Sequence, residues 1–285
     1  MKNRLKRLTA VVAVIGITGA LIAGCGSKDN TKAENKNSSK KETITIATSG
    51  SPNPFSYVDE DNNTTGYDVE IIKEVMKRLP EYDYKIEVAD FSGIFGGLDS
   101  DKYQIGVNNF SYNKERAEKY NYTDPIFKNS YVVAVAKDNT DINHFEDLLG
   151  KSTELDANTT YATALQSYNE ENPDNPINIS YYNDVGLVEI LQHVADGQYD
   201  FQIIDEPMFN NYMKEYNLDL KAVKLTEEES NKITTPYSYA LVGKTHKDLV
   251  EKINTQLTEM VKDGTVKKIS EKFFNGVDYT PYDKY

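Results

Sequence analysis

The sequence predicts an α/β protein built on an open sheet, and two observations support this fold class. Strand-like apolar runs alternate along the chain with segments of helical periodicity, which indicates parallel strands joined by crossover helices. Small polar residues follow several of the apolar runs, as they do where strands of such sheets end at a ligand site. The 285 residues are enough for one large domain or two of ordinary size.

The polar segment Asn108–Pro125 is the centre of the predicted site. It lies between two strand-like runs, Tyr103–Val107 and Tyr131–Ala136, and it contains Arg116. An arginine close to the end of a strand offers a planar, two-pronged donor for a carboxylate. The alternative is a surface loop with a solvated arginine.

The first residues indicate export. Four basic side chains precede an apolar run, 8–23, that is short for a membrane span. The run ends in Leu21-Ile22-Ala23-Gly24-Cys25, which is similar to a bacterial lipobox cleaved ahead of a lipid-bearing cysteine. We therefore expect a signal peptide over 1–24 and a diacylglycerol anchor on Cys25, which would hold the protein at a membrane surface without spanning it. An ordinary signal peptide with an incidental cysteine is the alternative.

Residues 25–41 read as a flexible tether, because they are rich in lysine, asparagine and serine and almost free of apolar residues. Cys25 is the only cysteine, so no disulfide can form within the chain. The net charge is −13, and it becomes more negative once the basic leader is removed. Such a charge argues against binding to nucleic acid.

Several elements can be predicted from apolar spacing. A strand is expected over 43–47, and a helix over 69–79 with Asp68 as its cap and Pro80 as its end. A second helix is expected after Asp184, closed by Gly197. Further elements are a short helix that begins near Phe91, a buried strand 201–204, a late strand 237–242 and a long amphipathic helix 249–261.

Three of the predicted element ends carry polar groups that suit an amino-acid zwitterion. Arg116, with Asn109 and Ser111, could hold a carboxylate, and the helix that starts at Thr159 offers free N–H groups to an anion. Asp205 follows an apolar strand, where an unpaired charge is costly and an ammonium partner would explain it. A helix N-cap is the alternative role for Asp205.

Catalysis and cofactor binding have little support in the sequence. The three histidines are scattered, and the chain has no nucleophile motif, phosphate-binding loop or metal-ligand spacing. We expect no catalytic residue, no metal and no cofactor.

From Thr43 onward the chain resembles the polar amino-acid binding proteins of ABC importers, the extracytoplasmic solute-binding proteins of the glutamine, histidine and cystine type. Seven short segments, in this order, carry the resemblance: Pro54-Phe55-Ser56-Tyr57, Gly66-Tyr67-Asp68-Val69, Asp90-Phe91-Ser92-Gly93-Ile94, Glu115-Arg116-Ala117, Tyr122-Thr123-Asp124-Pro125, Ile204-Asp205-Glu206-Pro207 and Asp263-Gly264-Thr265.

The resemblance implies a type II periplasmic-binding-protein-like fold, in which two α/β lobes are joined by a two-segment hinge and close on a ligand in the cleft. The first lobe would comprise 42–128 and 236–285, and the second 129–235. The expected partners are an amino acid and a membrane permease with its ATPase, and the protein is expected to be a monomer.

The resemblance also assigns roles to individual residues. Arg116 would bind the α-carboxylate with help from the Thr159 region. Asp205 would bind the α-ammonium, assisted by Ser111 and Asn109, and Phe91 would form an aromatic wall.

Two positions depart from the pattern of the family. Pro52 stands where relatives often have an aromatic residue, which weakens the expected aromatic sandwich around the ligand. Ser49 stands where some relatives have an acid, which argues against a basic amino acid as ligand.

The pair Asn108-Asn109 looks most like the cystine-binding members of this family, so cystine is the first choice of ligand. Glutamine or another uncharged polar amino acid is the alternative. A surface adhesin and an enzyme on the same fold are alternatives from other functional classes.

Overall fold

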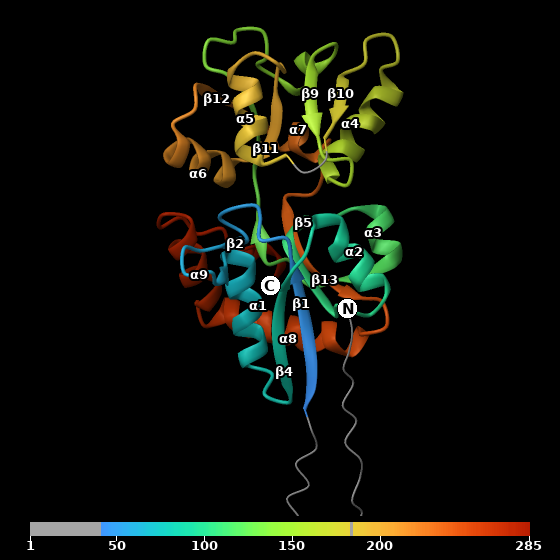
Figure 1. Cartoon of the computed structure of the whole chain (residues 1–285), viewed down its shortest axis with the longest axis vertical. Helices are drawn as coiled ribbons and strands as arrows, with labels where there is room; N and C mark the ends of the chain where they lie inside the picture. The colour runs from blue at the N-terminus through green and yellow to red at the C-terminus, as the bar shows by residue number, and fades with distance from the viewer. Residues whose placement is uncertain (1–40, 183–184) are drawn as a thin grey trace, which may run out of the picture. The chain divides into compact units, whose positions relative to one another are not determined.

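The computed structural model describes residues 41–182 and 185–285. The predicted leader, Cys25, the tether up to residue 40 and Asp184 lie outside the described residues. The described elements belong to two groups, each organised around its own strands (Figure 1). Within these residues, none of the helices has the length and apolar character needed to cross a membrane.

The first lobe is built on a sheet in the order β4-β1-β5-β13-β6, with β7 paired to β13. Its strands are β1 (Glu42–Thr48), β4 (Tyr82–Val88), β5 (Ile105–Ser111), β6 (Tyr120–Tyr122), β7 (Phe127–Lys128) and β13 (Tyr237–Gly243). β1 runs parallel to β4 and β5, whereas β13 is antiparallel to β5, β6 and β7. The parallel sheet that we predicted is therefore correct only for three strands, because β13 enters the sheet from the other lobe and not through a crossover helix.

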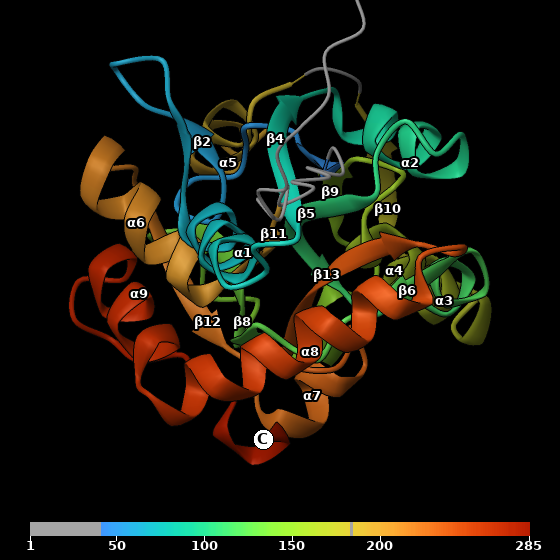
Figure 2. The same ribbon diagram turned by 90° about the horizontal axis from the view of Figure 1, so that it is seen from below.

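Helices of the first lobe pack on this sheet and on one another. They are α1 (Tyr67–Lys77), α2 (Phe91–Asp99), α3 (Lys114–Lys119), α8 (Lys247–Lys262) and α9 (Thr265–Phe273), with the short hairpin β2 (Tyr57–Val58) and β3 (Thr64–Thr65) and the 3-10 turn η2 (Tyr282–Lys284). Figure 2 shows α1, α8 and α9 side by side, in agreement with their contacts. Beneath them Phe55 packs edge-on against Phe127 with ring centroids 4.9 Å apart, and both rings are fully buried.

The second lobe contains two small sheets. β8 (Tyr131–Ala136) lies between β11 (Gln202–Asp205) and β12 (Leu220–Lys224), antiparallel to both, and β9 (Ser152–Leu155) pairs in parallel with β10 (Asn178–Tyr181). The helices are η1 (Phe145–Leu148), α4 (Thr160–Glu171), α5 (Leu187–Ala195), α6 (Glu206–Tyr216) and α7 (Glu227–Asn231). Val133, Val135 and Ile203 are buried between these layers.

The chain crosses between the lobes twice, once from β7 to β8 and once from α7 to β13. The two crossing segments are hydrogen-bonded to each other, since the Asn129 amide donates to the Pro236 carbonyl at 2.8 Å. Paired extended segments of this kind can bend together, and one cluster of buried apolar residues includes members of both lobes, such as Val75 and Leu191.

The predicted start of the first helix is wrong, and its predicted end agrees with the structure. The N-cap of α1 is Gly66 and not Asp68, whose carboxylate instead accepts a hydrogen bond from the Asn109 amide. The same helix ends at Lys77, shortly before Pro80, because a proline disfavours helical backbone in the residue before it. The late strand and the long amphipathic helix are confirmed as β13 and α8.

Gly66 is required by the backbone at the start of α1. Its φ of 120° lies in the region that side chains disfavour, and an added Cβ would lie 2.4 Å from the Phe55 carbonyl oxygen. We predict that Gly66→Ala lowers the free energy of unfolding by about 2 kcal/mol or more. Chemical denaturation of the unliganded protein measures this change.

The matched control is Gly96→Ala inside α2, where an added Cβ meets nothing within 4 Å. Alanine favours the helix there, so the control should be neutral or stabilising by up to about 1 kcal/mol. Equal stability of the two variants would contradict the steric argument.

Candidate functional site

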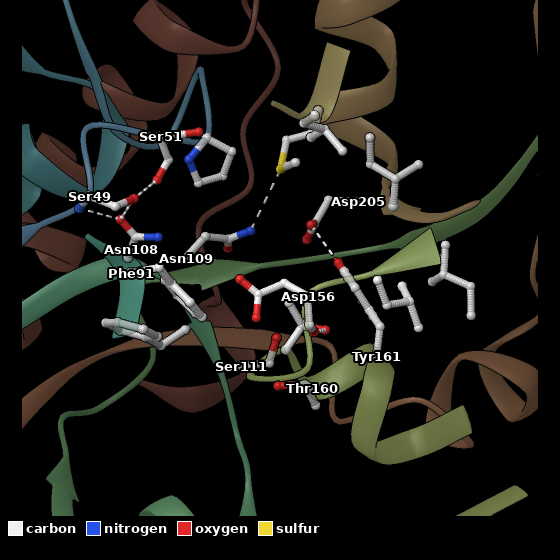
Figure 3. Close-up of a pocket in the computed structure, with 18 of the residues that line it drawn as sticks. Ser49, Ser51, Phe91, Asn108, Asn109, Ser111, Asp156, Thr160, Tyr161 and Asp205 are labelled. Carbon is white, nitrogen blue, oxygen red and sulfur yellow. Dashed lines mark hydrogen bonds between the residues drawn. The ribbon is translucent and has the colours of Figure 1, made fainter. Parts of the chain in front are cut away.

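A cavity of about 500 Å³ is lined by residues from both lobes. The six side chains that the sequence selects for ligand binding all line it: Phe91, Asn109, Ser111, Arg116, Thr159 and Asp205. Figure 3 shows Ser49, Phe91 and Asn109 on one side of this cavity and Asp205 and Tyr161 on the other.

The strand β5 positions the polar side chains of the first lobe. We predicted a strand that ends at Val107, but β5 continues to Ser111, so Asn108, Asn109 and Ser111 are part of the strand and not of a following loop. Pairing with β13 through Ser238 extends it. The partner strand lies more than a hundred residues away in sequence, so local spacing could not show this extension.

Asn108 braces the loop that follows β1. Its side-chain oxygen accepts hydrogen bonds from the Ser49 amide at 2.9 Å and from the Ser49 hydroxyl at 2.8 Å. Ser49 and Pro52, the two positions that depart from the family pattern, both line the cavity. The loop therefore presents the small side chains of Ser49 and Pro52 to the cavity. These are the two positions at which the family pattern has an acid in some relatives and an aromatic residue in many.

Arg116 lies on α3 with its guanidinium over aromatic rings. The guanidinium carbon is 4.9 Å from the centroid of Phe95 and 5.6 Å from that of Phe110. One nitrogen donates to the Asn158 carbonyl of the second lobe at 2.5 Å. Burial lowers the pKa of Arg116 from its ordinary value, yet an arginine remains charged at neutral pH.

The guanidinium of Arg116 has no carboxylate within 4.0 Å among residues 41–182 and 185–285. The guanidinium has five N–H donors, and one of its nitrogens donates to the Asn158 carbonyl. The remaining donors are available. The arginine can therefore offer a fork of donors to an anion in the cavity.

Thr159 is the N-cap of the twelve-residue helix α4. Its hydroxyl oxygen accepts the Ala162 N–H at 3.2 Å, and the hydroxyl donates to the Asp156 carbonyl at 2.7 Å. The hydroxyl is thus used within the protein. An anion would instead meet the backbone N–H groups of the first turn and the positive end of the helix dipole.

Asp205 ends β11 and lies at the start of α6, with a side chain that is 2% exposed. One carboxylate oxygen accepts the Tyr161 hydroxyl at 2.7 Å, and the other has no hydrogen-bond partner among residues 41–182 and 185–285. Asp205 occupies the N-cap position of α6, as the alternative expected, but its side chain makes no capping hydrogen bond to that helix. Burial raises the pKa of Asp205 to about 6, although Tyr161 and Asn109 oppose the shift.

Asn109 faces Asp205 from the first lobe and adopts an unusual backbone conformation. Its φ is 51°, in the left-handed region that asparagine tolerates better than most residues. Its side-chain oxygen is buried without a partner, and its amide nitrogen is 4.0 Å from the Met208 sulfur. Two buried acceptors, on Asn109 and Asp205, therefore lack a donor.

Sequence reasoning missed several residues of the site, namely Phe95, Asp156, Tyr161 and Tyr182. Phe95 stacks on Arg116 and Tyr161 bonds Asp205, so both act through residues that we did predict. The spacing of Phe91 and Phe95 on one helix was the one available signal, because residues four apart share a face.

The charge of the cavity is unbalanced. Among the described residues that line it, Arg116 is the only lysine or arginine, whereas Asp90, Asp156 and Asp205 are acidic. This balance favours a ligand that carries at least as many cationic as anionic groups. No group of three or more potential metal ligands occurs within residues 41–182 and 185–285.

The capping role of Thr159 leads to a prediction. Thr159→Ala should lower the free energy of unfolding by about 1 kcal/mol, because the first turn of α4 loses its side-chain acceptor. Thr159→Ser keeps the hydroxyl and should stay near wild type. Thermal unfolding measures both variants, and equal losses for alanine and serine would show that the methyl group and not the cap matters.

Comparison with known proteins places these features in a family. Residues 44–276 match the model of the bacterial extracellular solute-binding proteins, family 3. The L-cystine-binding protein TcyA of Bacillus subtilis is 31% identical over 277 residues, covering 94% of this chain and 97% of the relative. The probable amino-acid-binding protein YxeM of the same organism is 31% identical over 267 residues, covering 93% and 94%.

A solved structure from work on glutathione import in Gram-positive bacteria, through GshT and the cystine ABC importer TcyBC of Streptococcus mutans, is also similar. It is 38% identical in sequence with a TM-score of 0.78, covering 85% of this chain and 98% of that one. The predicted fold class, two α/β lobes of the type II periplasmic-binding-protein kind, is confirmed. The chain belongs to the bacterial extracellular solute-binding proteins of family 3.

Proposed function

We propose that this protein is the extracytoplasmic binding component of an ABC importer and captures a polar amino acid. Arg116 would hold the α-carboxylate and Asp205 the α-ammonium. One observation carries the proposal: a buried carboxylate with an unpartnered oxygen and a guanidinium without a carboxylate partner line the same cavity from different lobes. Each group has the charge that the opposite end of a zwitterion needs.

L-cystine is the ligand that we favour. TcyA is named as an L-cystine-binding protein, and it aligns with this chain over almost its full length. Cystine has two ammonium groups and two carboxylates. The three acids and one arginine of the cavity suit a ligand that is rich in ammonium groups. Glutamine or another uncharged polar amino acid is the alternative.

Glutathione is a further candidate, because the similar solved structure comes from work on glutathione import. At neutral pH glutathione carries two carboxylates and one ammonium. Cystine balances its two carboxylates with two ammonium groups, whereas glutathione would bring a net negative charge into a cavity whose described lining has three acids and one arginine, Arg116. The charge balance therefore favours cystine over glutathione.

Ligand capture would involve closure of the lobes. We assign residues 42–128 and 236–285 to the first lobe and 129–235 to the second, with the paired crossing segments as the hinge. A ligand that contacts both lobes stabilises the closed state by its differential affinity. We infer that the closed, loaded monomer then delivers the amino acid to a membrane permease with its ATPase.

We call Arg116 and Asp205, with the two ends of the zwitterion that they would hold, the clamp. The clamp leads to a direct prediction for two variants. Arg116→Ala and Asp205→Ala should each weaken binding by about 2–5 kcal/mol, or roughly 30- to several-thousand-fold, because each leaves one end of the zwitterion unpaired in a partly desolvated site. Isothermal titration of residues 41–285 with L-cystine, L-glutamine and glutathione measures the affinities.

Arg78→Ala is the matched control for Arg116→Ala. Arg78, the other arginine of residues 41–285, binds Glu74 and Asp263 at the surface of the first lobe and does not line the cavity. The control should bind like wild type. Binding by either clamp variant within about threefold of wild type would remove that residue from the site, and preference for glutathione over cystine would contradict the charge argument.

We also propose that residues 1–24 are a signal peptide and that Cys25 carries a lipid. Cys25→Ser removes the acyl acceptor, and the protein should then leave the membrane fraction of the producing cells and enter the medium or periplasm. Fractionation followed by immunoblotting measures this. Retention of the variant in washed membranes would contradict the anchor.

A further inference from the structure

Asp68 is a buried acid that the proposed clamp does not use. It lies in the first turn of α1 and its side chain is completely buried. One carboxylate oxygen accepts the Asn109 backbone N–H at 2.5 Å, and the other has no partner. No lysine, arginine or histidine lies within 4.0 Å of it in the part of the chain that the structure describes.

The positive end of the helix dipole favours an acid in this first turn, but it does not require the acid to be completely buried without a cation. Gly66 occupies the N-cap, and the Asp68 side chain bonds to β5 and not to α1. A buried carboxylate without a cation is destabilising and is retained where it has a further use. Its single hydrogen bond leads to Asn109, a residue of the ligand cavity.

Asn109 connects Asp68 to the ammonium subsite. The hydrogen bond that the Asn109 N–H donates to the Asp68 carboxylate fixes the backbone of Asn109, whose φ is 51°. In this conformation the Asn109 side chain lies near Met208 and Asp205 of the second lobe, and its oxygen is buried without a partner. Extended β conformation at Asn109 would redirect the side chain, because side-chain direction follows the backbone.

Asp68 and Asp205 also interact through their charges. Burial and, as a smaller cause, the charge of Asp205 together raise the pKa of Asp68 to about 7, although the Asn109 hydrogen bond opposes the shift. Three tyrosines also face this pair: Tyr67 next to Asp68, Tyr161 bonded to Asp205, and Tyr131 near Asp205. Burial raises the pKa of all three. An ammonium at Asp205 would thus relieve the repulsion between two carboxylates.

We propose that Asp68 is a positioning residue of the ammonium subsite. It orients Asn109 toward Asp205, and its buried negative charge strengthens the attraction for the ligand's ammonium without touching the ligand. This inference rests on the proposed function, because it takes the cation at Asp205 to be the α-ammonium of an amino acid.

The binding test uses Asp68→Asn, which keeps an oxygen for the Asn109 N–H and removes the charge. The probes are L-cystine and L-glutamine, each paired with its des-amino analogue, dithiodipropionate and glutaramate. At pH 7.5 the variant should bind the amino acids about 3- to 100-fold more weakly, the range of coupling between neighbouring groups. The des-amino analogues should lose less than twofold.

The pH profile separates a charge effect from a structural one. Wild-type affinity should rise between pH 6 and 7.5 as Asp68 ionises, and Asp68→Asn should lose this rise while keeping the fall below pH 6 that belongs to Asp205. Glu229→Gln is the control, since buried Glu229 also accepts a backbone N–H, from Phe145 at 2.9 Å, but does not line the cavity. It should change neither affinity nor profile.

A ligand-free measurement keeps the inference independent of ligand identity. Carbon-13 NMR should show the Asp68 carboxyl titrating near pH 7 in wild type and at lower pH in Asp205→Asn, because the neighbouring charge is gone. An unchanged Asp68 titration, equal losses for amino acids and des-amino analogues, or an Asp68→Asn profile like wild type would each overturn the proposal. Failure of wild type to bind either amino acid would contradict the proposed function and leave the NMR result to decide on Asp68.

Discussion

The unpaired carboxylate of Asp205 is the constraint around which the site is arranged. Its side chain is almost fully buried, and one oxygen has no partner. An isolated buried charge costs several kcal/mol, and the Tyr161 hydroxyl offsets only part of that cost. A cation beside Asp205 would offset the rest of that cost, which is the role that we propose for the ammonium of the ligand.

Two lobes satisfy this constraint in a way that one domain could not. The second lobe carries Asp205 at the end of β11 and the start of α4 nearby, while the first lobe carries Arg116 over Phe95. A rigid site that enclosed a zwitterion on all sides would exclude its ligand as well as water. Paired crossing segments, joined by the Asn129–Pro236 hydrogen bond, let the two halves of the site separate and meet again.

Asp205 and Arg116 differ in the number of contacts that hold each side chain in place. The guanidinium of Arg116 lies over two aromatic rings and binds the Asn158 carbonyl, so it is held in place in the empty cavity. Asp205 has one hydrogen bond and an elevated pKa. The arginine would thus orient the ligand, and the aspartate would make ligand binding depend on pH. Both effects follow from the way each group is buried.

Strand and helix periodicity are local properties of the chain, so the sequence by itself predicted an α/β protein, and its short motifs indicated the family. The sequence also selected six residues that line the cavity. Tertiary structure decided the rest. The length of β5 depends on pairing with β13, the partner of Asp68 is Asn109 on a distant strand, and Tyr161 reaches Asp205 across 44 residues. Such contacts join segments that no local pattern connects, so only packing of the folded chain could establish which polar atoms are satisfied and which remain free for a ligand.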